Sequence, residues 1–450
     1  MAAPLENVPG KAWIVTFAGT AINLCLGILY AWSVWGDKLT VPKMADGKTF
    51  DLAKVGTPLL VKGVPDAMNA GWSYISNADA ATPFSLCVIM FALLMIPGGR
   101  IQDKYGPKVG ATIGGLFLAA GCIIAGLMKS YTGLIVGFGI MGGIGMGIGY
   151  AAPTPAALKW FGPHKRGLIA GLVVGGYGGA ALYIAPLATW LIQNYGLSGS
   201  FIILGIVFAV VVIIAGQLLS WPPAGYVPPG TPALIAGTPG KGAMTAWDWT
   251  VSEMTQTWQF YALVIMFIGS TQSGLLIISS ALGIGKGLLG AALAWTLVSF
   301  GGLVNAFGRV GTGLYSDKIG RTNAYTLNCA VSAACLFLLP MILASKNVFL
   351  MFLAIGIAYW QYGGGLALLP SFTADFFGPK NLGFNYGLVF IGWGLGFFMA
   401  RLGGTIKDIT GSLNWAFYLS GIVLIIAVVL ARLTKRPSAE QLRTSAAAAK

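Results

Sequence analysis

Long apolar stretches recur through this chain, and each is close to the ~20 residues that a helix needs to cross a bilayer. Shorter polar segments separate most of them. This pattern predicts an all-α membrane protein. The predicted spans are residues 12–35, 82–99, 109–128, 131–158, 168–193, 198–220, 260–284, 289–315, 323–344, 348–374, 384–406 and 415–433.

The composition also favours a membrane protein over a soluble one. Hydrophobic residues make up 56% of the 450 residues and charged residues 9%, whereas roughly a quarter of a soluble domain is charged. The net charge of +14 does not indicate nucleic-acid binding. The basic residues are scattered between apolar stretches and do not gather with aromatic residues on one face. We therefore predict a lipid bilayer as the surroundings and no nucleic-acid partner.

The distribution of basic residues predicts the orientation, because cytoplasmic loops of membrane proteins are enriched in lysine and arginine. With the N-terminus inside, the short outside loops hold only Lys129, Lys286, Lys346 and Lys407. The inside segments hold Lys11, Arg100, Lys104, Lys108, Lys159, Lys165, Arg166, Lys241, Lys318, Arg321, Lys380, Arg432, Lys435, Arg436, Arg443 and Lys450. We predict a multi-pass protein of the cell (inner) membrane with both termini cytoplasmic.

Two long connections divide the chain. Residues 36–81 separate the first two spans. Residues 221–258 contain six prolines and several glycines, a composition typical of a linker. The predicted organisation is an N-terminal six-helix half over residues 1–220, a cytoplasmic linker over 221–258, a C-terminal six-helix half over 259–434 and a cytoplasmic tail over 435–450.

Two motifs occur once in each half, and the separation between the two copies is nearly the same for both. GRIQDKYGPK at residues 99–108 follows the second span, and GLYSDKIGR at residues 313–321 follows the eighth. WFGP at residues 160–163 is repeated as FFGP at residues 376–379, and each copy leads into a glycine-rich helix. Two independent motifs with nearly one separation indicate a parallel repeat of six helices.

The charged residues of the first motif lie where spans meet the inside face. There an acidic residue at a helix end, beside basic residues, can join neighbouring helices. The alternative is that these charges only set the topology. The candidate conformational latch consists of Asp103, Lys104, Lys108, Asp317, Lys318 and Arg321.

The first motif resembles the signature loop of the major facilitator superfamily, Gly-x-x-x-Asp-Arg/Lys-x-Gly-x-Arg/Lys. Over nearly its whole length the chain is similar to bacterial oxalate/formate antiporter-family proteins and to their monocarboxylate-transporter relatives. The matching stretches are PGGRIQDKYGP at 97–107, SDKIGR at 316–321, ALLPS at 367–371 and NYG at 385–387. The resemblance implies the major facilitator fold, with twelve transmembrane helices in two six-helix halves.

Arg309 is a charged residue inside a predicted span, and such residues indicate functional sites. It lies eight residues before Asp317, so ~12 Å of helix separates it from the inside end. Its repeat counterpart is Met95, so neither symmetry nor topology requires a charge there. No Asp or Glu falls at comparable depth. Because an anionic substrate relieves the cost of an unpaired buried cation, we predict that Arg309 binds a carboxylate with its planar fork of donors.

Asn305 lies one turn before Arg309, on the same helix face. It orients the arginine or binds a substrate oxygen, and a simple bond between helices is the alternative. In the animal monocarboxylate transporters that the chain resembles, this position is usually an Asp that takes part in proton coupling. Asparagine does not titrate, so this departure puts that proton route in doubt.

The resemblance also implies an aromatic cage. Tyr30, Tyr150 and Tyr177 match cage aromatics of the family's oxalate transporter, and Tyr362 falls where that cage has a Trp. Helix packing is the alternative reading for each. Where that transporter has a membrane-embedded lysine, this chain has Trp393. One cation in place of two favours a monoanion over a dianion, and an apolar Trp favours an acid with a methyl group.

These observations favour secondary transport of a short-chain monocarboxylate such as L-lactate or pyruvate, by alternating access with a proton. Two alternatives stay open: organic-anion exchange of the oxalate/formate type, and a transporter-like membrane sensor. No enzyme is predicted, because no nucleophile–base pair, metal cluster or P-loop is recognisable. We predict no cofactor and no metal, and a monomer whose partners are a small monocarboxylate anion, a proton and the bilayer. No buried carboxylate or histidine is expected, so the substrate itself is predicted to carry the proton.

Overall fold

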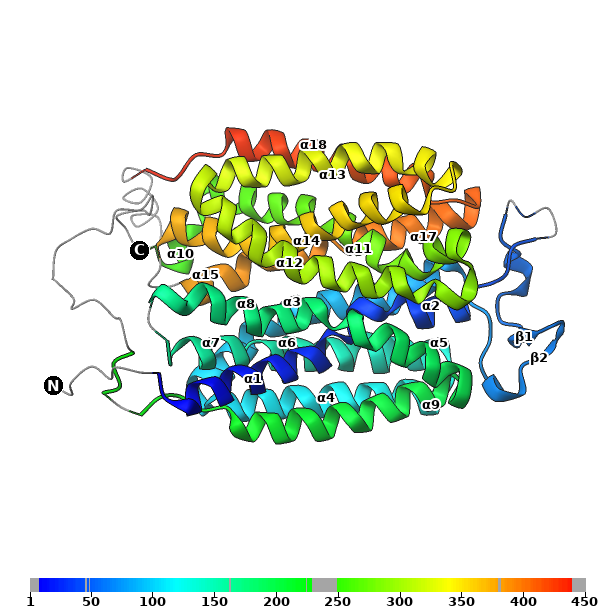
Figure 1. The fold of residues 1–450 in the computed structure, drawn as a ribbon, viewed down its shortest axis with the longest axis horizontal. Helices are drawn as coiled ribbons and strands as arrows, with labels where there is room; N and C mark the ends of the chain where they lie inside the picture. The colour runs from blue at the N-terminus through cyan, green and yellow to red at the C-terminus, as the bar shows by residue number, and fades with distance from the viewer. Residues whose placement is uncertain are drawn as a thin grey trace.

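A computed structural model of the protein describes residues 8–44, 47, 49–161, 163–223, 225–228, 249–378 and 382–438. Most of these residues lie in helices that run along the long axis of the molecule (Figure 1). In chain order the elements are α1 (Gly10–Leu26), η1 (Gly27–Ala31), α2 (Ser33–Leu39), η2 (Leu52–Lys54), β1 (Leu60–Val61), β2 (Val64–Pro65), η3 (Ala67–Asn69), α3 (Asn77–Tyr105), α4 (Pro107–Met128), α5 (Tyr131–Gly133), η4 (Leu134–Gly142), α6 (Gly143–Tyr150), α7 (Pro153–Leu158), α8 (Pro163–Gly179), α9 (Ala181–Leu218), α10 (Val251–Thr255), α11 (Trp258–Leu293), α12 (Trp295–Ile319), α13 (Arg321–Ala344), α14 (Val348–Phe377), α15 (Leu382–Val389), α16 (Ile391–Leu395), α17 (Phe398–Thr410) and α18 (Asn414–Leu433).

The helices form two bundles, one from each part of the chain. In Figure 1, α1, α4 and α9 lie along the lower edge and α13 and α18 along the upper edge. The bundles meet where α12 packs against α8 and α9, and where α3 packs against α15, α16 and α17. A ligand-binding site between the two bundles is therefore expected close to these contacts and to η1, which also contacts α12.

Ten helical segments among the described residues are long and apolar enough to cross a membrane. One of them, Gly171–Leu218, has 48 residues, and a straight helix of that size would be about 72 Å long, more than twice the ~30 Å of a hydrocarbon core. It breaks at Gly196, where φ is 71°, a conformation that glycine adopts without steric cost. We infer that this segment crosses twice and that α12 crosses once. The all-α membrane fold predicted from the sequence is confirmed.

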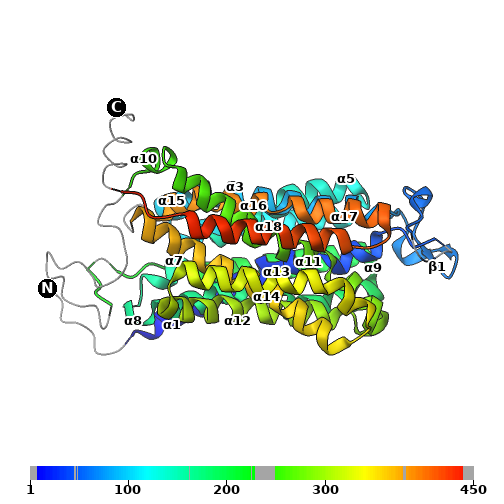
Figure 2. The ribbon, with the colours of Figure 1, turned by 90° about the horizontal axis from the view of Figure 1, so that it is seen from above.

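The first and the last long helices begin and end on the same side of the molecule. Figure 1 shows the start of α1 and the end of α18 at the left, and β1 and β2 at the right; Figure 2 shows the same order along the long axis. We call the left side the terminal end and the right side the β end. An even number of crossings brings a chain back to the side on which it started, which agrees with the predicted spans.

Several predicted spans are interrupted near the middle of the bundle. The first span divides into α1, η1 and α2, and the eleventh divides into α15, α16 and α17. The first break begins at Gly27, where a Cβ atom would lie 2.6 Å from the Tyr177 carbonyl oxygen and 2.4 Å from the Ala180 Cβ atom. Only glycine lets the two backbones approach so closely. The sequence does not predict these breaks, although discontinuous helices commonly surround the binding sites of transporters.

Two predicted connections contain structure of their own. At the β end, residues 36–81 include the short antiparallel pair β1 and β2, with Leu60 opposite Pro65. Inside the predicted linker, α10 begins with a capping box between Thr250 and Glu253. Just before it, the Trp249 carbonyl accepts a hydrogen bond of 3.0 Å from Asn385, which ties this segment to the C-terminal bundle. The greater part of that linker lies outside the described residues.

Candidate functional site

Arg309 lies near the middle of α12, where the two bundles meet, and only 6% of its surface is exposed. Its Nη2 donates to the Tyr30 hydroxyl over 3.0 Å, and its Nη1 donates to the Val174 carbonyl over 3.4 Å. Its Nε donates to Asn305 Oδ1 over 3.4 Å. Because Tyr30 belongs to η1 and Val174 to α8, the guanidinium group joins the C-terminal bundle to the N-terminal one.

Asn305 is fully buried one turn before Arg309. Its Oδ1 accepts from the arginine, and since a guanidinium group only donates, this contact fixes the orientation of the amide. Asn305 Nδ2 is then left without a hydrogen-bond partner among the described residues. A buried donor without an acceptor is costly. The site therefore offers an N–H donor that a ligand oxygen can satisfy.

Two tyrosine hydroxyls and an indole form a chain next to the guanidinium group. The hydroxyls of Tyr30 and Tyr362 lie 3.1 Å apart, and Trp393 Nε1 donates to the Tyr362 hydroxyl over 2.8 Å. Tyr30 accepts from Arg309 and Tyr362 accepts from Trp393, so one hydroxyl proton bridges the pair and the other is free to donate elsewhere. All three aromatic side chains are buried, with exposures of 1% or less.

Tyr150 and Tyr177 complete the group that the sequence predicts. The Tyr177 ring packs edge-on against Tyr30 and Tyr150, with centroid distances of 5.3 and 5.1 Å. Tyr177 donates to the Met146 sulfur over 3.6 Å, and Tyr150 interacts with the Arg309 guanidinium group. The structure thus brings all seven predicted substrate-site residues into one connected group, which we call the Arg309 cluster: Arg309, Asn305, Tyr30, Tyr150, Tyr177, Tyr362 and Trp393.

Phe91 packs against three aromatic residues of this cluster and is not predicted from the sequence. Its ring contacts Tyr150, Tyr177 and Trp393, with centroid distances of 5.3, 5.6 and 4.9 Å. Phe390 stacks on Trp393 at 5.0 Å and also faces Phe91 at 5.8 Å. These two phenylalanines give the cluster an apolar wall opposite its polar donors.

The internal repeat contains a signal for these missed residues. Aligning the two copies of the first motif places Phe91 at the position of Asn305 in the other half. Aligning WFGP with FFGP pairs Tyr177 with Trp393, and pairs Val174, whose carbonyl accepts from Arg309, with Phe390. The cluster therefore includes equivalent positions of the two halves. Projecting Asn305 through the repeat would have identified Phe91, whereas Phe390 corresponds to Val174, which is not among the predicted residues.

The expectation of no buried carboxylate is wrong for Asp408. This residue lies in the last turn of α17, at the β end, and is 7% exposed. Its two oxygens accept from the backbone N–H groups of Asn77 and Ala78, over 3.0 and 2.8 Å, so packing against the start of α3 buries it. No salt bridge joins Arg309 to a carboxylate in the part of the chain that the structure describes.

The candidate latch of the first motif lies at the terminal end. The side chains of Asp103 and Asp317 lie outside the described structure. Lys108 and Lys318 are exposed, and Lys104 Nζ lies 5.1 Å from the centre of the Tyr105 ring. Arg321 Nε lies 3.9 Å from an oxygen of Asp375. Between the bundles at this end, the Arg100 guanidinium group lies 4.7 Å from the centre of the Phe384 ring.

The chemistry of the Arg309 cluster suits a small organic anion. It combines a permanent cation, a free amide donor and a tyrosine hydroxyl proton with an apolar wall. A buried charge is costly unless it is paired, and a carboxylate would pair with the cation and satisfy the donors. The described hydrogen-bond partners of Arg309 are an amide, a carbonyl and a hydroxyl, and they include no nucleophile paired with a base.

Comparisons with known proteins agree with this geometry. The family model of the Major Facilitator Superfamily matches residues 12–400. The oxalate:formate antiporter of Oxalobacter formigenes is 31% identical and covers 79% of this chain and 82% of its own length. Monocarboxylate transporter 12-B of Danio rerio is 23% identical, over 74% of each chain.

A solved structure shows the same fold at low sequence identity. The xylose transporter XylE from E. coli, in a partially occluded inward open conformation, superimposes with a TM-score of 0.64. It covers 93% of this chain and 98% of its own, at 11% identity, so it shows the fold alone. Taken with the family match, these findings mean that the chain belongs to the major facilitator superfamily of transporters, in the family of the oxalate:formate antiporter.

Proposed function

We propose that this protein transports a short-chain monocarboxylate, such as L-lactate or pyruvate, across the cell (inner) membrane by alternating access, together with a proton. The observation that carries the proposal is that a buried guanidinium group lies beside a buried amide donor, Asn305 Nδ2, which has no hydrogen-bond partner among the described residues. Arg309 and Asn305 lie one turn apart, so a single carboxylate can accept from both. Relatives that are named as carriers of oxalate, formate and monocarboxylates support an organic anion as the substrate.

The orientation belongs to the same proposal. The terminal end carries Lys11, Arg100, Lys159 and Arg432, whereas in the long β-end connection, residues 36–81, five lysines are balanced by five aspartates. Since basic loops favour the cytoplasm, the β end faces outward and both ends of the chain face inward. Six of the seven residues of the Arg309 cluster are buried, and Tyr150 is partly exposed.

The direct test is a panel of labelled acids offered to proteoliposomes that contain the purified protein. We expect saturable uptake of lactate or pyruvate above that of protein-free liposomes, and weaker uptake of oxalate. A xylose control should show none, because the Arg309 cluster is built for an anion. Binding of an acid without uptake would instead indicate a sensor, and preference for oxalate would exclude the monocarboxylate proposal.

Anion exchange is the second candidate, and a specific observation favours it. The groups that contact Arg309 are a hydroxyl, an amide and a carbonyl. None of these groups is a carboxylate or an imidazole. A carrier whose site keeps its positive charge returns more readily with a second anion bound than empty. Measuring net uptake and counterflow at several pH values distinguishes exchange from proton symport.

Replacing Trp393 by lysine is expected to shift selectivity from lactate toward oxalate by about tenfold. The new cation would lie beside the Tyr362 hydroxyl that Trp393 now contacts, close enough to pair with the second carboxylate of a dianion. The measurement is the ratio of oxalate to lactate uptake at equal concentration.

Trp393→Phe is the matched control for this prediction. It keeps the apolar wall against Phe91 and Phe390 but loses the N–H donor, so it should weaken binding of both acids without changing their ratio. An unchanged ratio in a stable, inserted Trp393→Lys protein would remove the argument that the number of cations sets the preference.

A further inference from the structure

A small polar cavity lies between the two bundles, on the β-end side of the Arg309 cluster. Its volume is about 40 Å³, and its walls come from α2 with the flanking Trp32 and Thr40, and from α3, α11 and α17. We call it the β-end cavity. The polar side chains that line it are those of Trp32, Ser33, Asp37, Thr40, Asn77, Ser279, Ser280 and Lys407.

The cavity lies in line with the Arg309 cluster. Ser33 follows Tyr30 by three residues, about one helical turn, and Tyr30 is the residue that accepts from Arg309. Ala400, in the cavity wall, follows Trp393 by seven residues, about two turns or roughly 10 Å. Both segments thus run from the cluster directly into the wall of the cavity, as the side chains along a permeation pathway would.

Lys407 brings a positive charge to this cavity. It is only partly buried, and its Nζ lies 5.0 Å from the centre of the Phe50 ring. The two nearest carboxylates are already engaged: Asp37 pairs with Lys286, and Asp408 accepts from the start of α3. Within the described residues no salt bridge joins Lys407 to either carboxylate, although both act on its charge at longer range. An anion in the cavity would compete with them for this charge.

Ser33 gives a second and independent indication of a ligand. Its side chain is 1% exposed, and its hydroxyl has no hydrogen-bond partner among the described residues. The nearby hydroxyls of Ser279 and Thr40 are satisfied by the carbonyls of Leu276 and Asp37, over 2.9 and 3.1 Å. A buried hydroxyl that lines a cavity without any partner is expected to bind a ligand atom or a water.

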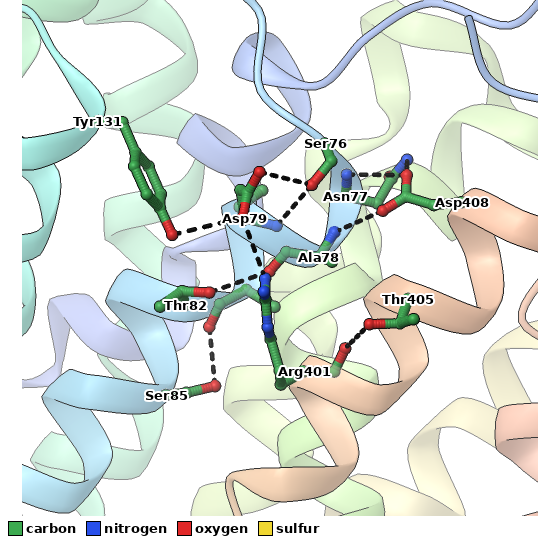
Figure 3. A network of polar contacts seen from close by, with 12 residues as sticks. Ser76, Asn77, Ala78, Asp79, Thr82, Ser85, Tyr131, Arg401, Thr405 and Asp408 are labelled. Carbon is green, nitrogen blue, oxygen red and sulfur yellow. Dashed lines mark hydrogen bonds and ion pairs between the residues drawn. The ribbon is translucent and has the colours of Figure 1, made fainter. Parts of the chain in front are cut away.

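The outer rim of the cavity is closed by contacts between the bundles. Figure 3 shows Asp408 reaching from α17 to the first residues of α3. Besides the two backbone groups, the Asn77 side-chain amide donates to Asp408 over 2.8 Å. Nearby, Arg401 pairs with Asp79 over 3.3 Å. In this closed arrangement the cavity takes water-sized groups only, and it must widen when these contacts separate.

We propose that the β-end cavity is a second binding site, which holds the carboxylate of the transported acid between Lys407 and Ser33 before the acid reaches Arg309. This rests on the proposed function and adds where the acid first binds. The site is filled from the β end when the Asp408 contacts open. It raises the concentration of the anion next to the Arg309 cluster, so its loss weakens capture from that side only.

The test compares Ser33→Ala, Lys407→Gln and the control Lys62→Gln in right-side-out vesicles, with labelled L-lactate as the probe. Lys62 is exposed at the tip of the β1–β2 pair, so its variant changes the β-end charge equally, away from the cavity. We expect the external KM to rise about 5- to 10-fold in both cavity variants, with Vmax within about twofold of wild type and the control unchanged. The KM for efflux from the inside should stay as in wild type.

Ser33→Ala is the decisive variant, because in the part of the chain that the structure describes the Ser33 hydroxyl makes no hydrogen bond that the change could remove. A purely structural role for this region predicts no change in KM for it. An active protein whose external KM is unchanged in both variants overturns this inference and leaves the proposed function intact. A wild-type protein that transports no acid of the panel overturns both.

Discussion

Replacing Arg309 by lysine is expected to lower uptake of the acid by about 100-fold or more, although lysine keeps the charge. The guanidinium group donates to three partners from three separate nitrogens. An ammonium group is a single point of charge, so it cannot hold Tyr30 and Val174 and also bind both oxygens of a carboxylate. Losing two charge-assisted hydrogen bonds, each about 1.5–3 kcal/mol, gives this magnitude. Arg309→Ala should abolish uptake.

The measurement is the initial rate of labelled lactate uptake, divided by the amount of protein inserted in the vesicles. Arg401→Lys is the matched control, because Arg401 makes a partly exposed pair with Asp79 through one nitrogen. Such a pair needs only a positive charge, so the control should keep most of its activity. If Arg309→Lys transports as fast as Arg401→Lys, the carboxylate does not bind at Arg309.

Features of the fold that depend on which residue types a stretch contains, such as the membrane-spanning helices, could be predicted from the sequence. A stretch of apolar residues long enough to cross a bilayer has one stable outcome, so the helices follow from composition and length. Arg309 is also predictable as a site residue, because a charged side chain at membrane depth costs free energy whatever its helix packs against. The Arg309 cluster collects its tyrosines because the repeat fixes which helices face each other.

Features that depend on packing between distant segments could not be predicted. Asp408 looks like a loop residue in the sequence, and only its contact with the start of α3, 331 residues away, buries it. The break at Gly27 depends on how closely Tyr177 of another helix approaches. Ser33 is one of many serines, and the absence of a partner for its hydroxyl among the described residues is visible only once its neighbours are placed.

The positions of these contacts indicate how access alternates. Arg309 joins the bundles in the middle, and Asp408 joins them at the β end through the start of α3. Opening toward the β end must break the Asp408 contacts, whereas the Arg309 contacts need only exchange a protein acceptor for a carboxylate oxygen. A bound acid therefore weakens the central connection between the bundles and compensates for it with its own hydrogen bonds.

Net uptake is expected to rise as the external pH falls from about 8 to 6, whereas counterflow of labelled against unlabelled acid should be faster and less dependent on pH. Desolvation in the closed cluster raises the pKa of the bound acid, and Arg309 lowers it. A proton therefore joins the acid only where desolvation outweighs the guanidinium charge. Net uptake by symport needs that step in every cycle, so its rate can change by up to about tenfold per pH unit. In counterflow the carrier returns with an anion bound, so the cycle does not need the protonation step.

Two variants test which group binds the transported proton. Asp408→Asn removes the one buried carboxylate among the described residues, and Lys62→Gln again serves as a distant control. If the acid carries the proton, both variants should keep the pH dependence of net uptake, even where Asp408→Asn changes the rate because the β end opens more easily. Loss of the pH response in Asp408→Asn alone would assign proton binding to the closure of the β end. If an imposed pH gradient drives no net uptake in the wild type while counterflow persists, obligate exchange is favoured, because a carrier that never returns empty has no step at which a proton is required.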